Sequence, residues 1–552
     1  MSTTILTGGP IRTMTDDPGG DLSGNLSGDA QVPEAVLVHD GVVQAVGSLT
    51  EMRRAAYVTP EEIDLDGRTL MPGFVDAHAH TILHGSAIDW VDLSGARSID
   101  DVVRLLGARA EARRGEAVRG YGYDQSKLAE GRHPSAADLD RVARDRVVQI
   151  QHASGHGYVV NTLALRNAGI TATTPTPAGG RIDRDADGEP TGVLFDSACD
   201  LLTGAEGVKV RNHGPNFHLP MTHAEIDHLF DLGQRSLLEA GITTMCDAQV
   251  TQLEMDAYLR ARDEGRLRMR TEMLALSSNL EHLTGLGMSS RLGDDQLRLW
   301  GVKLYADGSV IARTAYLNGH ACCGKPSPNG YLYHEPEELA ALITTAHRLG
   351  LSTATHAQGP LPIGVVLDAV AAARAERPRT GLVHRIEHCG FPTGEQIGRM
   401  AGLHVVPVPQ PMQVSLYGDS LMEEFGEFGG RFYPYGEFER AGLPVVISSD
   451  APVTMPNPLE AVWAAVTRET LGGAISGEEA QQAGRANALR GVTVTPAQML
   501  GRQDIGVIRP GARADLAFLD ADPVTVPVGQ LPKVGVTESW IGGERIAPIQ
   551  VA

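Results

Sequence analysis

The length, composition and charge of this chain exclude several classes of protein. By length alone, 552 residues correspond to about three or four domains, although a large barrel can use most of such a length as one unit. Hydrophobic residues make up 42% of the chain and charged residues 21%, as in soluble globular proteins. The net charge of −21, from 47 basic and 68 acidic side chains, argues against nucleic acid or an anionic membrane surface as a partner.

The cysteines and the apolar runs indicate where the protein acts. No stretch near the N-terminus combines a basic segment with an apolar core, and no apolar run has membrane-spanning length. The five cysteines form no spaced framework, so a disulfide-built secreted protein is not expected. We therefore expect a cytoplasmic protein that acts on a small molecule without a nucleic-acid or membrane partner, and a homodimer is an open alternative.

The two ends of the chain share a β-type pattern. Short β-branched runs that end at Gly turns begin at residues 3, 34 and 42, and similar runs begin at residues 506, 514 and 534. Between the first two runs, residues 16–32 form a loop rich in Gly, Ser and Asp. We predict that residues 1–69 and 501–552 pair into a single small β-type side domain beside a central domain at 70–500.

The central residues 70–500 alternate between strand-like and helix-like segments. Apolar strand-like runs begin near residues 71, 241, 268, 297, 351, 382, 404 and 443. Strands alternating with helices in this number favour an α/β fold of the (β/α)₈ TIM-barrel type, because each parallel strand needs a crossover. An open doubly wound sheet is the alternative, although no Gly-x-Gly-x-x-Gly turn follows any of these strands.

One long segment interrupts this alternation between the first and second strands. Residues from about 120 to 218 are too many for a plain connection and contain turns and short strands of their own. Loops that follow barrel strands lie at the catalytic end of a barrel. We therefore predict an inserted subdomain that covers the site.

The pair His78 and His80 ends the first central strand. Residues i and i+2 of a strand share a face, so both imidazoles point the same way and could hold one metal ion. An isolated His-x-His is more often just two polar residues at a strand end. Here, however, further residues of metal-ligand type end other predicted strands, namely Lys303, His356, His388 and Asp450. In a barrel these strand ends converge on one mouth.

Lys303 requires its own interpretation, because apolar residues flank it and an unpaired ammonium there would be costly. One alternative is an ion pair with Asp307. The other is that the neutral amine takes up carbon dioxide to become a carbamate, an anionic ligand able to bridge two ions. The surrounding candidate ligands favour the carbamate.

Other polar residues are candidates for substrate contacts. His156 in the insertion is the best of them, and Arg313 and His320 follow the fourth strand. For His320, as for His84, a solvated loop position is the simple alternative. His384 lies on the same strand face as His388 but deeper, which predicts a core histidine, and Cys246 is interpreted as a small buried hydrophobe.

Several motifs together resemble a known family. They are Pro72-Gly-Phe-Val-Asp-Ala-His-Ala-His80, Val302-Lys-Leu-Tyr-Ala-Asp-Gly-Ser309, Thr355-His-Ala, Arg385-Ile-Glu-His388 and Ser448-Ser-Asp-Ala-Pro-Val453. In these the chain is similar to the amidohydrolase superfamily, and within it to amidohydrolase family 3, the group that contains N-substituted formamide deformylase. The resemblance covers nearly the whole chain and is specific for the family rather than for a substrate.

The resemblance implies a fold, a metal centre and a reaction. The fold is a distorted (β/α)₈ barrel with a β-sandwich from both chain ends, and the reaction is hydrolysis of amide-like C–N bonds. His78, His80 and Asp450 would hold one divalent ion and His356 and His388 another, with carboxylated Lys303 as the bridge. Zinc is the expected ion, although iron, manganese or nickel would accept the same ligands.

The expected mechanism is attack of metal-bound hydroxide on the carbonyl carbon, with Asp450 as the proton shuttle. Three alternatives stay open. Ester, lactone or cyclic amide hydrolysis could use the same scaffold, the protein could be an inactive binding or regulatory homologue, or the histidines could be structural and the metal absent.

Overall fold

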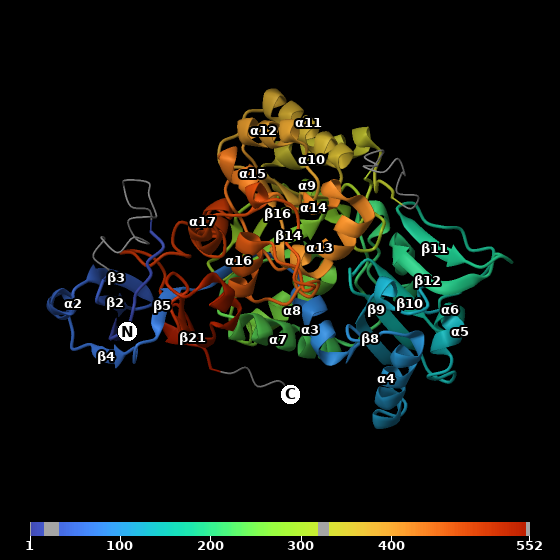
Figure 1. The fold of residues 1–552 in the computed structure, drawn as a ribbon, viewed down its shortest axis with the longest axis horizontal. Helices are drawn as coiled ribbons and strands as arrows, with labels where there is room; N and C mark the ends of the chain where they lie inside the picture. Colours follow the sequence, from blue (N-terminus) through green and yellow to red (C-terminus); the bar gives the residue numbers. More distant parts are fainter. Residues whose placement is uncertain (1, 16–32, 318–329, 548–552) are drawn as a thin grey trace.

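A curled parallel sheet forms the centre of the molecule in the computed structural model, which describes residues 2–15, 33–317 and 330–547 (Figure 1). Its strand order is β19-β18-β17-β16-β14-β13-β6, with the short β15 (Leu292–Gly293) added antiparallel to β16. The parallel strands are β6 (Phe74–Ala79), β13 (Ile242–Val250), β14 (Arg270–Leu276), β16 (Leu297–Tyr305), β17 (Ser352–Ala357), β18 (His384–His388) and β19 (Val405–Val408). The predicted α/β fold with a parallel sheet is confirmed.

Helices cover this sheet and leave its strands buried. β6, β13 and β17 are buried at every residue, as expected for parallel strands that are covered on both faces. The covering helices include α7 (His223–Glu239), α8 (Gln252–Asp263), α10 (Pro336–Leu349), α11 (Pro360–Glu376) and α12 (Gly394–Leu403). In α7, Thr222 and Glu225 form a reciprocal capping box that begins the helix.

The prediction of an eighth strand at 443–450 is wrong, because these residues form no regular strand. The segment lies beside β6 through only a few bonds: Asp450 N donates to His78 O over 2.7 Å and His80 N donates to Ala451 O over 3.0 Å. Pro444 in this segment, and Pro407 and Pro409 in and after β19, lack the N–H groups that a ladder between the two would need. Closure into a full (β/α)₈ barrel therefore stays a prediction.

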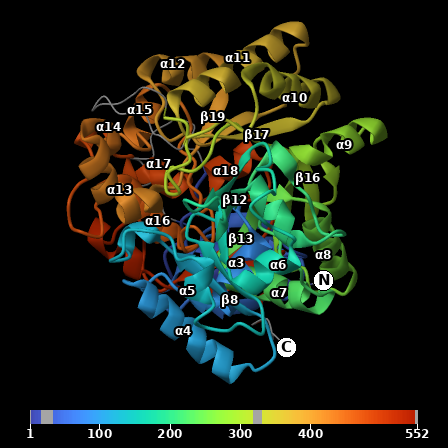
Figure 2. The same ribbon diagram turned by 90° about the vertical axis from the view of Figure 1, so that its right-hand side faces the viewer.

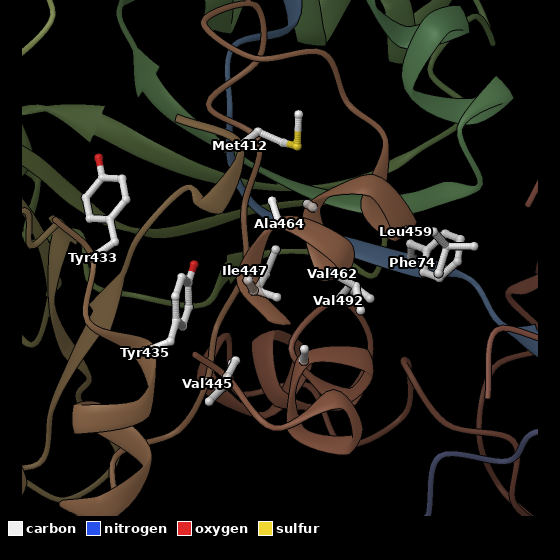
Figure 3. Packing of buried hydrophobic residues seen from close by; sticks show 14 of the residues in the cluster. Phe74, Met412, Tyr433, Tyr435, Val445, Ile447, Leu459, Val462, Ala464 and Val492 are labelled. Carbon is white, nitrogen blue, oxygen red and sulfur yellow. The ribbon is translucent and has the colours of Figure 1, made fainter. Parts of the chain in front are cut away.

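Packing holds the 443–450 segment instead of a ladder. Val445 and Ile447 belong to a large buried cluster with Phe74 of β6 and Leu459 of α16 (Pro458–Thr467), and Figure 3 shows these side chains together. Ile447 N also donates to Gly491 O over 2.9 Å. Apolar burial thus places Asp450 next to the end of β6.

A second sheet lies beside the first, at the right of Figure 1 and facing the viewer in Figure 2. Its order is β11-β12-β10-β9-β8-β7, from β7 (Val91–Asp92), β8 (Val118–Tyr123), β9 (Val148–His152), β10 (Gly157–Val160), β11 (Gly180–Arg184) and β12 (Pro190–Asp196). It also carries α4 (Ile99–Ala112). These elements fall between β6 and β13, where an insertion was predicted, although the sheet begins before residue 120. The limits of a subdomain stay a prediction.

The two chain ends supply two small sheets. One has the order β3-β2-β1-β4, from β1 (Thr3–Thr7), β2 (Ala35–His39), β3 (Val42–Gly47) and β4 (Glu61–Asp64). The other, β22-β21-β20-β5, joins β5 (Thr69–Pro72) to β20 (Leu516–Leu519), β21 (Val536–Ile541) and β22 (Glu544–Arg545). Residues of both sheets pack in one buried cluster, among them Leu6, Val36, Phe518 and Trp540. The sandwich as a separate unit, with the boundaries 1–69 and 501–552, stays a prediction.

The first predicted central strand is divided between two sheets. Thr69–Pro72 pairs with β20, and only Phe74–Ala79 belongs to the main sheet. The chain changes partners at Gly73, whose N–H donates to Asp515 O over 2.8 Å while Phe74 N donates to Gly241 O over 2.9 Å. Within the described residues, no helix is long and apolar enough to cross a membrane.

Candidate metal centre

Three of the predicted ligands converge at the carboxyl edge of the main sheet. His78 lies near the end of β6, His388 ends β18, and Asp450 follows the extended segment beside β6. One ligand atom from each of these residues lies within 4.8 Å of the others, so the three side chains could hold one metal ion. His80 joins them, since its Nε2 and the Nε2 of His78 each lie 3.3 Å from Asp450 Oδ1.

His356, at the end of β17, lies on the other side of His388. The two ring centroids are 4.4 Å apart. His356 Nε2 donates to Gly308 O over 3.0 Å, and the ring stacks on Tyr305 at 5.2 Å. His356 is therefore adjacent to the three converging residues without being one of them.

Lys303, on β16, is fully buried, and its Nζ has no hydrogen-bond partner among the described residues. Nζ lies 4.7 Å from the centroid of the Tyr305 ring. Burial lowers the pKa of Lys303 to about 8, even though the negative charges of Glu387 and Asp450 act to raise it. The alternative partner Asp307 instead accepts backbone N–H groups from Tyr316, Gln358 and Gly359. The proposed ion pair is not formed.

Glu387 and Arg385 of β18 form a buried charged pair behind His78, a feature for which sequence reasoning assigned no role. Glu387 Oε2 contacts His78 Nδ1, and Glu387 Oε1 lies 2.6 Å from Arg385 Nε. Arg385 also donates to Ala77 O over 3.0 Å. Burial acts to raise the pKa of Glu387, but Arg385 and His78 outweigh it and hold that pKa at about 2. The available signal was an Arg and a Glu two residues apart inside a run predicted to be a central strand.

Neutral amides complete the surroundings of the centre, and no pattern in the sequence indicated them. His388 Nδ1 donates to Gln410 Oε1 over 2.7 Å. Gln413 Nε2 lies 3.4 Å from Asp450 Oδ2, and Tyr433 Oη donates to Gln413 Oε1 over 2.9 Å. These groups follow β19 and reach the centre only through the fold.

The protonation states suit a divalent cation. Burial lowers the pKa of His80 to about 4 and that of His388 to about 3, so both rings are neutral at pH 7 and can offer a lone pair. Burial acts to raise the pKa of Asp450, but His78 and His80 hold it well below its usual range. His78 Nδ1 faces Glu387 Oε2, which leaves Nε2 as the ring nitrogen beside Asp450 Oδ1. Two neutral imidazoles, those of His80 and His388, beside an ionised carboxylate form a nitrogen and oxygen ligand set that fits a divalent metal.

Strained backbone occurs at the same place. His388, Cys389 and Asp450 have φ values of 65°, 53° and 55°, in the left-handed region that residues other than glycine rarely adopt. Each such residue costs about 1–3 kcal/mol, and such residues cluster at functional sites.

The predicted substrate contacts have different surroundings. His156 is buried, its Nδ1 lies 2.7 Å from Asp196 Oδ1, and its ring lies 5.7 Å from that of His356. Arg313 is part-exposed and forms an ion pair with Glu424. His320 lies outside the described residues.

Three further expectations can be compared with the structure. The expectation of a solvated loop position for His84 is wrong. His84 lies in α3 (Thr81–Asp89) and is fully buried, with Nε2 3.0 Å from Ser236 Oγ. The reason is that α3 begins directly after β6, the first strand that carries candidate ligands. His384 is a buried histidine bonded to Thr353 and His347, as expected for a core residue. Cys246 is buried as predicted, and Arg385 donates to its sulfur over 3.5 Å.

Comparisons with known proteins agree with this geometry. A model of the amidohydrolase family matches residues 61–547. N-substituted formamide deformylase from Arthrobacter pascens is 32% identical over 523 residues, which cover 92% of this chain and 94% of that protein. Putative amidohydrolase YtcJ from Bacillus subtilis is 28% identical and covers 93% and 96% of the two chains.

A solved structure shows the same fold. An uncharacterized metal-dependent hydrolase from Pyrococcus horikoshii superposes with a TM-score of 0.74 at 26% identity, covering 96% of this chain and 99% of that one. The family match spans the main sheet, the second sheet and every candidate ligand. The chain is therefore an enzyme that belongs to the amidohydrolase family.

Proposed function

We propose that the protein is a metal-dependent hydrolase that cleaves an amide or formamide-like C–N bond in a small molecule. The observation that carries this proposal is the convergence of His78, His388 and Asp450 beside a buried Lys303 whose Nζ has no hydrogen-bond partner among the described residues. The activity named for the Arthrobacter pascens relative and the metal dependence named for the Pyrococcus horikoshii structure support it.

The same side chains suggest how one or two ions would be held. His78, His80 and Asp450 would bind one ion, and His356 and His388 the other. A divalent ion bound there supplies a Lewis acid for the substrate carbonyl and lowers the pKa of water from about 16 toward ~7. Zinc is the default ion for such nitrogen and oxygen ligands.

Lys303 would complete this ligand set as a carbamate. A pKa of about 8 leaves a fraction of the amine neutral at pH 7. The neutral nitrogen forms a bond to the carbon of carbon dioxide and loses one proton, which gives an anionic oxygen ligand. This change replaces a buried cation that has no hydrogen-bond partner among the described residues by an anion that bound cations would stabilise.

Asp450 is the proposed proton shuttle. Its carboxylate is ionised and lies 3.3 Å from two imidazole nitrogens, so it can accept the proton of the attacking water and pass it to the departing nitrogen. Glu387 keeps the proton of His78 on Nδ1, which directs His78 Nε2 toward Asp450. His156, which immediately precedes β10 of the second sheet, lies beside His356 and is the proposed substrate contact.

Metal analysis and a substrate panel test the proposal together. Purified protein should contain about one or two divalent ions per chain, and their removal by a chelator should abolish hydrolysis until metal is restored. The panel should contain formamides, acyl amino acids, cyclic amides, esters and lactones. Hydrolysis of only the esters or lactones would favour the alternative reaction, and full activity in metal-free protein would reject the metal mechanism.

A further inference from the structure

A buried cluster of three polar residues lies beside the candidate metal centre, between the second sheet and the segment before α10. It consists of His156 immediately before β10, Asp196 at the end of β12, and Tyr333 just before α10, all with little or no exposure. Asp196 N also donates to His156 O over 2.8 Å, which fixes the two backbones relative to each other. None of these three side chains has a role in the proposed proton transfer.

Hydrogen bonding within the cluster determines where His156 carries its proton. Asp196 Oδ1 accepts from Tyr333 Oη over 2.5 Å and from His156 Nδ1 over 2.7 Å. A carboxylate oxygen can only accept, so His156 Nδ1 is the donor to Asp196, and in the tautomer with its proton on Nδ1 the other ring nitrogen, Nε2, has a lone pair. Among the described residues, no hydrogen bond is formed by His156 Nε2.

The ring of His156 lies beside the proposed metal ligands. Nδ1 faces Asp196, and the ring centroid lies 5.7 Å from that of His356, which in turn lies 4.4 Å from His388. His156 is therefore held as a fixed acceptor next to the proposed ligands. Asp196 has a φ of 52°, in the left-handed region that residues other than glycine rarely adopt, and such residues cluster at functional sites.

We propose that His156, oriented by Asp196 and Tyr333, accepts a hydrogen bond from the N–H of the amide that is cleaved. This inference rests on the proposed function and deepens it, because it names the substrate class as amides with a hydrogen on the scissile nitrogen. His156 contacts the substrate, whereas Asp196 and Tyr333 are positioning residues.

A matched pair of substrates tests the inference. A secondary amide and its N-methylated tertiary analogue differ by the proposed donor. We expect the wild-type protein to prefer the secondary amide by about tenfold in kcat/KM, the usual size of one hydrogen bond. H156A should reduce that ratio to the intrinsic reactivity ratio of the two amides. H156Q, whose side-chain oxygen can accept in place of Nε2, should restore part of it.

The positioning residues have their own tests. Y333F removes one donor to Asp196 and should lower the ratio about two- to fivefold. The matched control is Y331F, because Tyr331 lies next to Tyr333 at 5.8 Å between ring centroids and its hydroxyl has no hydrogen-bond partner in the described chain. D196N can present an N–H to His156 Nδ1, which moves the proton to Nε2 and should abolish the preference. Equal ratios in Y333F, D196N and wild type would reject the positioning role.

Binding separates this inference from the proposed function. Calorimetry with the same two amides on a D450N background measures recognition without turnover, and H156A is compared in that background. A wild-type protein that cleaves neither amide overturns the proposed function, while a tighter secondary amide that depends on His156 still supports the subsite. Equal affinities for both amides in the D450N protein, or an unchanged ratio in H156A and H156Q, overturn the subsite.

Discussion

The two sides of the candidate centre differ in how their buried cations are balanced. On the side of His78, the fully buried Arg385 lies 2.6 Å from a Glu387 oxygen and donates to Ala77 O. On the side of His356, the fully buried Lys303 has no hydrogen-bond partner among the described residues. The first buried cation is therefore paired with a carboxylate, whereas the second has neither an ion pair nor a hydrogen bond among the described residues.

This difference shows which side depends on groups from outside the chain. A buried charge without a partner costs several kcal/mol, so a side chain such as Lys303 persists only where it serves another purpose. Arg385 is instead paired with Glu387, and Glu387 in turn contacts His78 Nδ1 and orients that ring.

Replacing Asp450 tests whether the side of the centre that contains His78 carries out the proton transfer. D450N keeps the shape of the side chain but removes the base, so turnover should fall at least about 1000-fold, while most of the metal stays bound through the histidines. Steady-state kinetics and elemental analysis of the same preparation measure both. Near-normal turnover would remove Asp450 from the mechanism.

Replacing Glu387 tests how far the orientation of His78 contributes to metal affinity. E387Q removes the carboxylate that orients His78, and metal affinity should fall about 10–100-fold. The matched control is E272Q, which breaks another buried Glu–Arg pair, with Glu272 2.7 Å from Arg298, on β14. Both variants should lose about 3–5 kcal/mol of stability because an arginine is left unpaired. Equal metal affinity in the two variants would contradict the orienting role.

The same carboxylate predicts a stability change at acid pH. The pKa of Glu387 is about 2 in the fold, against an ordinary value of 4.5. Its contribution is therefore complete above pH 4.5 and is lost as the pH falls toward 2, by about 3 kcal/mol in total. Urea unfolding of metal-free protein between pH 5 and pH 3 measures it, and E387Q should have a shallower dependence than the wild type.

Replacing Lys303 should raise the stability of the metal-free protein, whereas replacing Glu387 should lower it. Its pKa is about 8 in the fold against an ordinary 10.5, so the unfolded chain binds more protons in this window and stability rises with pH from 8 to 10.5. K303M should stabilise metal-free protein at pH 7 by about 3 kcal/mol and remove that pH dependence, while activity is lost. Urea unfolding in bicarbonate-free buffer at pH 7 and pH 10 is the measurement. A less stable K303M would mean that Lys303 is paired.

Replacing Gln410 should have the smallest effect on metal affinity, because this partner of His388 is a neutral amide rather than a carboxylate. Q410A removes the hydrogen bond to His388 Nδ1 and should weaken metal binding by less than about tenfold. Competition with a chromophoric chelator, run beside E387Q, measures the difference. A loss as large as that of E387Q would show that the charge on the partner is unimportant.

The sequence alone indicated most of the candidate ligands. His78, His80, Lys303, His356 and His388 each occur at or near the end of an apolar run, and strand period and parallel topology bring such ends together. The alternation of strands and helices likewise predicted the α/β fold. The eighth strand was misplaced, because apolar character at 443–450 records burial and not a hydrogen-bonded ladder, which the nearby prolines prevent.

Only the tertiary structure decided which groups surround those ligands. Glu387 contacts His78 across 309 residues of sequence, and Gln410, Gln413 and Tyr333 lie in segments without a chemical motif of their own. The burial of His84 likewise depends on how α7 packs on α3. Local pattern determines which residues can form strands and offer ligands, because it depends on neighbours in the chain. Charge pairing and orientation depend on contacts between distant segments, and these exist only once the chain has folded.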